Sequence, residues 1–586
     1  MSQAGIDVTD GEDDLRHCEE LASQLISVLD RMNSSKVPLA ESVVLRVVLH
    51  ARALINASTP VARLPPELLA YIFIYAALED ERVKLHKDTF PRFESPSRLA
   101  ISHVCHTWRE IALATPSLWA QIDNYWTTPR EEYIARSRGA GITLRVHGCY
   151  QGSTKSCIEP ISGRLRRLDI IDVRRHSIDA LRELEMPALE CLTADGRKIW
   201  DATLFRGQKT GLRALALHGL LVDRLPANQF PKLTHLHLSL HLKLEEESGS
   251  SLLSLLANTP ALQYLYFDDT DGLYGRDGGV VSYPESGIPV HDLVLLPSLR
   301  GLIMNNLHLT RALVLLEHLS MPQKPLIRLV SVVRSSAPAI PNIRRLLPGN
   351  ATSMQLVTRT TPDHERFQIV AHPADGNAGL WFSVRGGGAT VHQWPRMVHT
   401  MLPLSTLRCL TIAARDPALV PNILPHLPSL NTLRIMIGYD VSGDDQPAQL
   451  SEGLCTALAQ SSPLVCRSLR TLGLQFDDDA HDDPSVFSPL SLIDMATTRA
   501  QLNCRLHRVV IQWSRYSWHD DAETRQRFTD AFKPLAEVVD EVVLVGDEDA
   551  ESLDMMSVRP QWTMPDAERY WSLREFRESL PDRLDI

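Results

Sequence analysis

Alternating histidines near the middle of the chain are the first residues whose types could support chemistry. His235, His237 and His241 surround Ser239 at every second position, so a strand would carry all four side chains on one face. A row of imidazoles can bind a transition metal, but no cysteine or carboxylate at ligand spacing completes the set. We therefore interpret them as polar side chains facing out of a half-buried strand, and we expect no metal and no other cofactor.

Three further clusters suggest chemistry and have structural explanations. His103, Cys105 and His106 could pair a nucleophile with a base, but a helical pattern accounts for them. The acidic run 477–483 lacks the spaced oxygens, glycine and terminal glutamate of a calcium loop, and the glycines at 386–388 are not followed by the Lys-Ser/Thr of a phosphate loop. Motifs of hydrolases, zinc proteases and kinases are also absent. We expect no catalytic residues and predict that the protein is not an enzyme.

Composition indicates a large globular chain. Its 586 residues are 44% hydrophobic and 22% charged, which is enough for large cores and about two to four domains. The formal net charge of −11 and the isoelectric point near 6.1 disfavour nucleic acid as a partner, since no basic cluster is present.

Cysteine usage and hydropathy indicate the compartment. Nine cysteines are scattered without short paired spacings, which is typical of reduced thiols in the cytoplasm or nucleus. The first residues are polar and then acidic, and no uninterrupted apolar run reaches the length of about 18 residues that a membrane span needs. We therefore expect neither secretion nor a membrane partner.

The clearest helical pattern lies between Leu64 and Trp119. Pro65 and Pro66 suit the first turn of a helix, because proline has a fixed φ and no N–H to leave unpaired. Apolar residues then recur at steps of three and four, at Leu68, Leu69, Ile72, Phe73 and Ala76, and again at Val104, Trp108, Ile111 and Ala112. Thr115 precedes Pro116, so the second pattern should end there. Short helices bury little surface, and we expect an apolar face to be left for a partner.

This stretch resembles an F-box in the order of its residues: Leu64-Pro65-Pro66-Glu67-Leu68-Leu69, then Val104-Cys105-His106-Thr107-Trp108-Arg109-Glu110-Ile111-Ala112, and a closing Leu118-Trp119. In that family a three-helix motif docks on the Skp adaptor of a cullin–RING ubiquitin ligase, and the rest of the chain selects the substrate. The resemblance implies that the adaptor-binding residues are Leu64, Pro65, Leu68, Ile72, Val104, Cys105 and Trp108. A charged run, 79–88, interrupts the motif and is expected to be a solvated loop or helix extension.

Two more helices are predicted before this motif. Apolar residues repeat with helical spacing from Leu15 to Met32 and from Val44 to Ile55, with a turn at 33–36 between them. The pattern predicts an antiparallel hairpin that packs on itself or on the motif, and the alternative is a coiled-coil element that dimerises. The approach Pro60-Val61-Ala62-Arg63-Leu64-Pro65-Pro66-Glu67 resembles that of basidiomycete fungal F-box proteins.

A different order begins near residue 123, where a Leu-x-x-Leu-x-apolar phrase recurs. Its ten copies are Leu165-Leu168-Ile170, Leu189-Leu192-Ala194, Leu212-Leu215-Leu217, Leu233-Leu236-Leu238, Leu262-Leu265-Phe267, Leu299-Leu302-Met304, Leu407-Leu410-Ile412, Leu430-Leu433-Ile435, Leu469-Leu472-Leu474 and Leu506-Val509-Ile511. The last two apolar positions are two residues apart, so they point the same way from a short strand. Segments such as 251–260 and 454–460 have helical spacing and would form the opposite side.

This phrase is similar to that of the divergent leucine-rich repeats of F-box proteins. It predicts an irregular solenoid of parallel strands with helices, in which stacking builds a core that no single unit could make. Period-two segments between 350 and 390 predict extra strands that continue the sheet, and 542–545 a last strand. After an acidic linker, a helix from Pro565 that bears Tyr570, Leu573, Phe576 and Leu580 is predicted to cover the solenoid's open end, with a free partner-binding peptide as the alternative.

The predicted architecture is therefore α/β. It has an N-terminal helical hairpin (1–59), an F-box-like domain (60–122), an irregular leucine-rich-repeat domain (123–546) and an acidic linker with a C-terminal helix (547–586). We interpret the chain as the substrate-recognition subunit of a Skp–cullin–F-box ubiquitin ligase, whose partners are the adaptor and cullin complex and an unknown protein substrate. The alternative is a leucine-rich-repeat interaction scaffold without a link to ubiquitin, in which the three helices only cap the repeats.

Overall fold

A computed structural model describes residues 8–78, 96–123, 130–147, 154–171, 175–196, 199–201, 203–241, 246–268, 293–333, 343–347, 349–360, 365–376, 378–386, 394–413, 419–437, 446–460, 464–476, 488–513, 526, 529–545, 562 and 564–571. These residues fall into two compact units. The first contains the described residues up to Ala120 together with Glu132–Ala140, and the second contains the rest.

Two long helices begin the first unit, α1 (Val8–Asp30) and α2 (Val37–Ser58), with a 3-10 turn at Ser34–Lys36 between them. The predicted helices are therefore present. The predicted packing is not, because none of the side chains described from residue 13 to residue 58 is buried. Helical periodicity reports which face of a helix is apolar, but it does not report what covers that face.

The second unit is built on one large sheet. Within the described residues the sheet has 18 strands: β1 (Gln121–Asp123), β2 (Ile142–His147), β3 (Leu165–Ile171), β4 (Cys191–Asp195), β5 (Ile199–Asp201), β6 (Ala214–Arg224), β7 (His235–His241), β8 (Tyr264–Asp268), β10 (Gly301–His308), β12 (Leu326–Val333), β13 (Ser353–Thr360), β14 (Glu365–His372), β15 (Gly379–Gly386), β16 (Cys409–Ala413), β17 (Thr432–Ile437), β18 (Thr471–Phe476), β19 (Arg508–Trp513) and β20 (Glu541–Val545). Two short strands, β9 (Val294–Leu295) and β11 (Leu319–Ser320), form a separate parallel pair.

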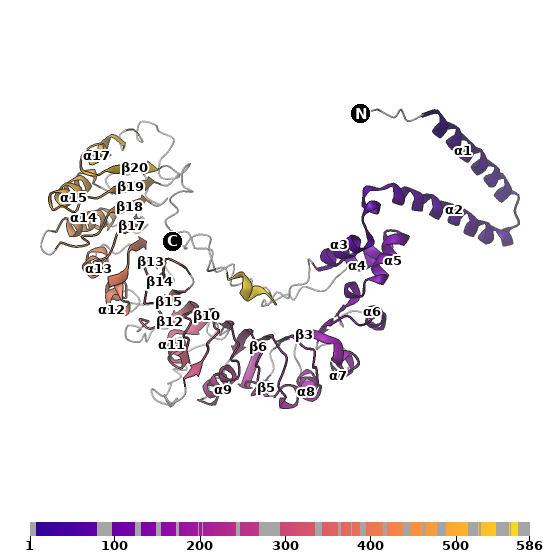
Figure 1. The fold of residues 1–586 in the computed structure, drawn as a ribbon, viewed down its shortest axis with the longest axis horizontal. Coiled ribbons are helices and arrows are strands. Elements are labelled where there is room, and N and C mark those ends of the chain that lie inside the picture. Colours follow the sequence, from indigo (N-terminus) through magenta and orange to yellow (C-terminus); the bar gives the residue numbers. More distant parts are fainter. Residues whose placement is uncertain are drawn as a thin grey trace. The chain divides into compact units, whose positions relative to one another are not determined.

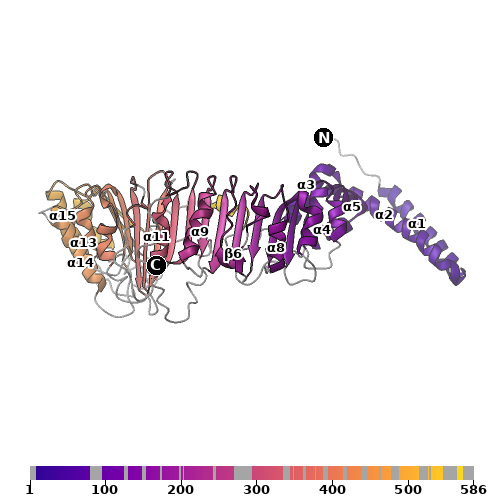
Figure 2. The same ribbon diagram turned by 90° about the horizontal axis from the view of Figure 1, so that it is seen from below.

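The strands follow one another in nearly sequential order, and almost all pairs are parallel. β1 pairs with β2, and the order continues through β3, β4, β6, β7, β8, β10 and β12, while β5 lies beside the far end of β6. After the insertion, β16 to β20 continue in the same way. Figure 2 shows the strands standing side by side in this row.

The repeated phrase sets the register of this sheet. The second apolar residue of each copy is a direct neighbour of the equivalent residue on the next strand. Before the insertion these residues are Leu168, Leu192, Leu215, Leu236, Leu265 and Leu302, and after it they are Leu410, Leu433, Leu472 and Val509. All of these side chains are buried. The phrase recurs because alternate residues of each strand point to the same face of the sheet and are buried against the same layer.

Helices cover one face of the sheet, and that layer includes α8 (Arg175–Glu183), α9 (Glu246–Ala257), α11 (Leu309–Glu317), α13 (Leu419–Ile423), α14 (Gln446–Ala459) and α15 (Pro489–Gln501) (Figure 1). The predicted helical segments 251–260 and 454–460 correspond to the ends of α9 and α14. We call the opposite face of the sheet the strand face.

The insertion between the two series continues the sheet, as predicted. β15 pairs in parallel with β12, whereas β14 is antiparallel to both β15 and β13. β13 then pairs in parallel with β16, which begins the second series. One antiparallel hairpin strand thus joins two parallel arrays without interrupting the hydrogen-bonded ladder.

The described part of the C-terminal segment does not lie at an end of the row of strands, where the cap was predicted. Its described part contains a 3-10 turn at Pro565–Glu568, and its Trp562, Met564, Ala567 and Trp571 pack in one cluster with strand-face residues of the middle strands. The aromatic side chains are buried on the strand face instead of at an end of the row. Leu573, Phe576 and Leu580 lie outside the described residues.

Two further observations concern the whole described part of the chain. No helix within it combines the length and the apolar character that crossing a membrane would require. The cysteines that the structure describes are free thiols.

Candidate protein-interaction surfaces

The predicted motif forms three α-helices and two 3-10 turns. α3 (Pro66–Leu78) begins at the predicted proline, α4 (Pro96–His103) follows, and α5 (His106–Ala114) ends immediately before Thr115. Thr115 has extended backbone angles, as expected for a residue before proline. The turns are Pro60–Arg63 and Pro116–Trp119. The run 79–88 lies outside the described residues.

One side of α3 faces the interior of this small unit. Leu69 and Phe73 are only 3% and 1% exposed, and the Phe73 ring lies 4.8 Å from the ring of Trp108. Ile111 and Ala112 on α5 are also buried. The predicted apolar positions of α3 therefore fall into two groups. Leu69 and Phe73 are buried in the unit, and the other predicted residues are exposed.

The closing Leu118-Trp119 completes this interior. Trp119 is fully buried, and its indole Nε1 donates a hydrogen bond to the carbonyl of Ala112 at 2.7 Å. Tyr133 of α6 (Arg130–Arg136) packs edge-on against the indole at 5.3 Å. Burial raises the pKa of Tyr133. The unit thus has its own core, closed by its last aromatic residue.

The opposite side of α3 is apolar and exposed. Leu68 and Ile72 are 49% and 48% exposed, and Val104, in the junction between α4 and α5, is 56% exposed. Leu64 is half-buried and Pro65 is exposed. Large apolar side chains that are exposed on one small unit are typical of a site that another protein covers.

Two of the predicted adaptor-binding residues have roles inside the unit. Trp108 is half-buried because it packs against Phe73. The sulfur of Cys105 accepts a hydrogen bond from the Trp108 N–H at 3.5 Å and so caps the N-terminus of α5. These residues hold the helices that carry the exposed face.

Three exposed apolar residues were missed by the sequence prediction. Tyr71 and Tyr75 on α3 are strongly exposed, and Leu99 on α4 is also exposed. The three- and four-residue steps from Leu68 to Ile72 and Tyr75 carry the signal that could have found the tyrosines. We call Leu68, Tyr71, Ile72, Tyr75, Leu99 and Val104 the apolar docking face.

The histidine and cysteine clusters have contacts within the fold. His106 pairs with Glu110 on the surface of α5 at 3.5 Å, and Cys105 serves as the helix cap. His235, His237 and Ser239 lie on β7 and are buried, so the prediction that they face solvent is wrong. In the part of the chain that the structure describes, no three His, Cys, Asp or Glu side chains gather as a metal site requires. The acidic run 477–483 and Gly387 and Gly388 lie outside that part.

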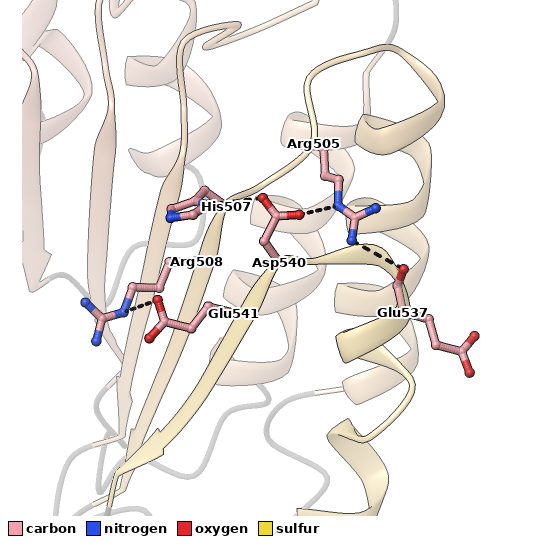
Figure 3. Close-up of polar contacts among 6 residues, drawn as sticks. All are labelled: Arg505, His507, Arg508, Glu537, Asp540 and Glu541. Atoms are coloured by element: carbon pink, nitrogen blue, oxygen red, sulfur yellow. Dashed lines mark hydrogen bonds and ion pairs between the residues drawn. The ribbon is translucent and has the colours of Figure 1, made fainter.

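A polar cluster at the start of β19 and β20 is a second candidate surface (Figure 3). Asp540 pairs with Arg505 at 2.8 Å and with His507 at 3.1 Å, and Arg508 pairs with Glu541 at 3.4 Å. Arg505 also donates to the carbonyl of Glu537. All of these side chains are largely exposed, and exposed pairs contribute only about 0–1 kcal/mol each. These ion pairs connect the start of β20 to the start of β19. Because the side chains are largely exposed, the cluster does not form a buried ligand site.

Comparison with known proteins supports the interpretation of the first surface. Residues 61–125 match the family model described as F-box-like, so the chain carries an F-box-like domain there. The matched residues include the whole apolar docking face. No curated protein matches this chain.

Proposed function

We propose that this chain is the substrate-recognition subunit of a Skp–cullin–F-box ubiquitin ligase. The single observation that carries the proposal is the apolar docking face within the F-box-like domain. F-box domains in general bind Skp-type adaptors, and this face supplies the apolar side chains that such an interface would bury.

The large sheet would hold the target protein. We interpret residues 123–546 as an irregular leucine-rich-repeat array, and the nearly sequential parallel strands, aligned leucines and single helix layer support this interpretation. Repeat arrays of this kind bind proteins on extended faces. Catalysis would belong to other subunits of the ligase. This chain would act by proximity, because holding target lysines near a charged conjugating enzyme raises their effective concentration.

The scaffold alternative makes a different demand on Leu68 and Ile72. A domain that merely capped the repeats would bury its apolar face in its own chain, whereas the proposal needs a separate partner for this face. Within the F-box-like unit itself both side chains are about half exposed.

The test compares three full-length chains for recovery of a purified Skp-family adaptor in a pull-down. The docking variant carries Leu68→Asp and Ile72→Asp. The matched control carries Leu39→Asp and Val47→Asp on α2, where the side chains are 70% and 66% exposed but lie outside the matched residues. Losing two buried aliphatic side chains removes about 3 kcal/mol or more, roughly a hundredfold in affinity.

We expect the wild type and the α2 control to recover the adaptor and the docking variant to lose it. Circular dichroism should show that all three chains are folded, since none of the changed side chains is in a core. Equal recovery by the wild type and the docking variant, or no recovery by the wild type, would overturn the proposal.

A further inference from the structure

The segment 562–571 lies on the strand face as a peptide would lie in a binding groove. Trp562, Met564 and Trp571 are buried, while Pro565, Asp566 and Arg569 between them are exposed. Ala567 and Glu568, in the 3-10 turn, are buried as well. Buried anchors with exposed residues between them are typical of a short segment that contacts a surface on one side only.

Small residues on the strands make room for the anchors. A Cβ atom on Gly301 would lie 2.9 Å from the Met564 sulfur, and one on Gly379 would lie 3.1 Å from the Trp562 ring. Cys191, Ala214 and Ala216 are further small residues of the strand face, and they belong to the same buried cluster as the anchors. Only small side chains at these positions permit such close contact.

Aromatic residues of the strands pack beside the anchors. The Trp562 ring packs edge-on against Trp381 at 5.6 Å, and the ring of Trp571 lies 6.0 Å from His237. His237 stacks flat on its register neighbour Tyr266, with ring centroids 4.3 Å apart. These rings provide large apolar contact with defined geometry, and edge-on pairs of this kind favour aromatic ligands.

Two polar contacts are directed at the main chain of the segment. Arg167 Nη1 donates to the carbonyl of Tyr570 at 2.7 Å, and His235 Nε2 donates to the carbonyl of Asp566 at 2.8 Å. Every peptide offers such carbonyls, so these two donors recognise a backbone and not a particular side chain. Specificity then comes from side chains of the segment, the aromatic anchors and also Asp566, which hydrogen-bonds to Tyr264.

We propose that the strand face between β3 and β15 is a docking site for short peptide segments that carry two aromatic anchors. Residues 562–571 occupy this site as an internal ligand, which a segment of a target protein displaces. This inference deepens the proposed function, because it names the class of target that the sheet takes. Its test uses no adaptor, so failure here and failure of adaptor binding are distinguishable.

Tethering makes the internal ligand a strong competitor. The segment is joined to β20 through residues 546–561, and a short tether gives an effective concentration on the order of millimolar. A free peptide should therefore bind weakly to the wild-type chain and much more tightly once the internal anchors are removed.

The experiment measures fluorescence anisotropy of a labelled peptide with the sequence of residues 560–573. The full chain is compared with a variant that carries Trp562→Ala and Trp571→Ala. We expect the variant to bind the peptide at least about tenfold more tightly than the wild type does. A control peptide with alanine in place of both tryptophans should not bind.

A neighbouring pair of arginines supplies a matched control. In the variant background, Arg167→Ala should weaken peptide binding by about tenfold, because a charge-assisted hydrogen bond to the peptide is lost. Arg166→Ala should leave binding unchanged, since Arg166 is exposed and pairs with Glu190. Failure of the peptide to bind the folded variant, or binding that does not depend on its tryptophans or on Arg167, would overturn the inference.

A second measurement applies if the tryptophan variant does not fold. A protease site is placed between residues 546 and 561 of the otherwise native full chain, and the purified chain is cleaved. We expect the C-terminal fragment to dissociate on dilution and to rebind saturably, leaving the sheet folded. A fragment that never dissociates, or a sheet that unfolds when the fragment leaves, would show that the segment is a permanent part of the domain.

Discussion

At the scale of single residues, two histidines on β7 make the contact with the C-terminal segment sensitive to pH. Burial lowers the pKa of His235, which faces Asp566, Arg569, Tyr264 and Tyr570. Burial lowers the pKa of His237 strongly, with His218 adding a repulsive charge when protonated, and Tyr266 and Trp571 contact its ring. Both imidazoles are thus neutral where the segment covers them.

The sign of the pH effect follows from linkage. We expect release of the segment to expose both imidazoles to water and so to bring their pKa values back toward 6.5. His235 would also lose the Asp566 contacts that raise its pKa, so the larger effect is expected at His237, and the released state should bind protons more readily than the docked state. Docking should be fully stable above pH 6.5 and should weaken as the pH falls below it. Hydrogen exchange at residues 562–571 should therefore accelerate between pH 7.5 and pH 5, after correction for intrinsic rates.

A variant separates this effect from general acid sensitivity. His237→Phe keeps the stacking on Tyr266 and removes the titrating group, so it should flatten the pH dependence. His106→Phe, at an exposed site on α5, should leave it unchanged. An identical pH dependence in the wild type and in His237→Phe would contradict this explanation.

Part of the set that the sequence assigned to adaptor binding is exposed, for a physical reason, and its binding role stays a prediction. Leu68, Ile72 and Val104 were predicted and are exposed, because a motif keeps such side chains at fixed positions on its helices. Trp108 and Cys105 were assigned to the same face, yet Trp108 packs on Phe73 and Cys105 caps α5. Spacing alone cannot divide an apolar helix into inward and outward sides when both sides are apolar.

At the scale of elements, the buried side chain of Arg499 connects α15 to the C-terminal end of α14 through hydrogen bonds. It lies on α15, and its guanidinium donates to the carbonyls of Leu458, Val465 and Cys466 at 3.2, 3.2 and 2.8 Å. Leu458 is in the last turn of α14, where carbonyls lack helical partners. A buried cation is stable there because it meets the negative end of the helix, although burial lowers its pKa.

Replacing this side chain should loosen both helices. Arg499→Met keeps an apolar side chain of similar length and removes the donor to all three carbonyls, of which only that of Cys466 keeps a second donor among the described residues, the Leu469 N–H. The loss should cost about 2 kcal/mol or more of local stability. Hydrogen exchange of the amides in α14 and α15 measures this loss directly. Arg467→Met, at an exposed position, should change it by less than about 0.5 kcal/mol. Equal protection in the two variants would show that the carbonyl contacts contribute nothing.

The strands were easier to predict than the packing of the N-terminal helices. The phrase Leu-x-x-Leu-x-apolar fixes a strand locally, and its copies align because each buries the same positions against the same layer. Packing of α1 against α2 has no comparable local signature. None of their side chains described from residue 13 onward is buried, so the helical period did not correspond to a buried face.

At the scale of the whole molecule, the placement of the C-terminal segment illustrates the limit of sequence reasoning. Arg167 and Tyr570 are 403 residues apart in the chain, yet they share a hydrogen bond. No local pattern specifies such a contact, since it depends on small residues that distant strands bring together. Tyr570 was expected on a terminal cap, and the glycines and alanines of the strand face explain why the segment lies on that face.

The two compact units correspond to the two tasks that the proposal assigns. The first carries the F-box-like helices with their apolar docking face, and the second carries the sheet with its occupied strand face. Each unit has its own buried core, so variants in one should leave the other folded. Adaptor binding and target binding can therefore be tested separately.

Hydrogen exchange of the full chain, alone and saturated with a purified Skp-family adaptor, tests the central claim most directly. We predict that the adaptor slows exchange in α3 and between Leu99 and Trp108, and leaves α1 and α2 unchanged. Absence of binding, or protection found only outside residues 61–125, would contradict the account.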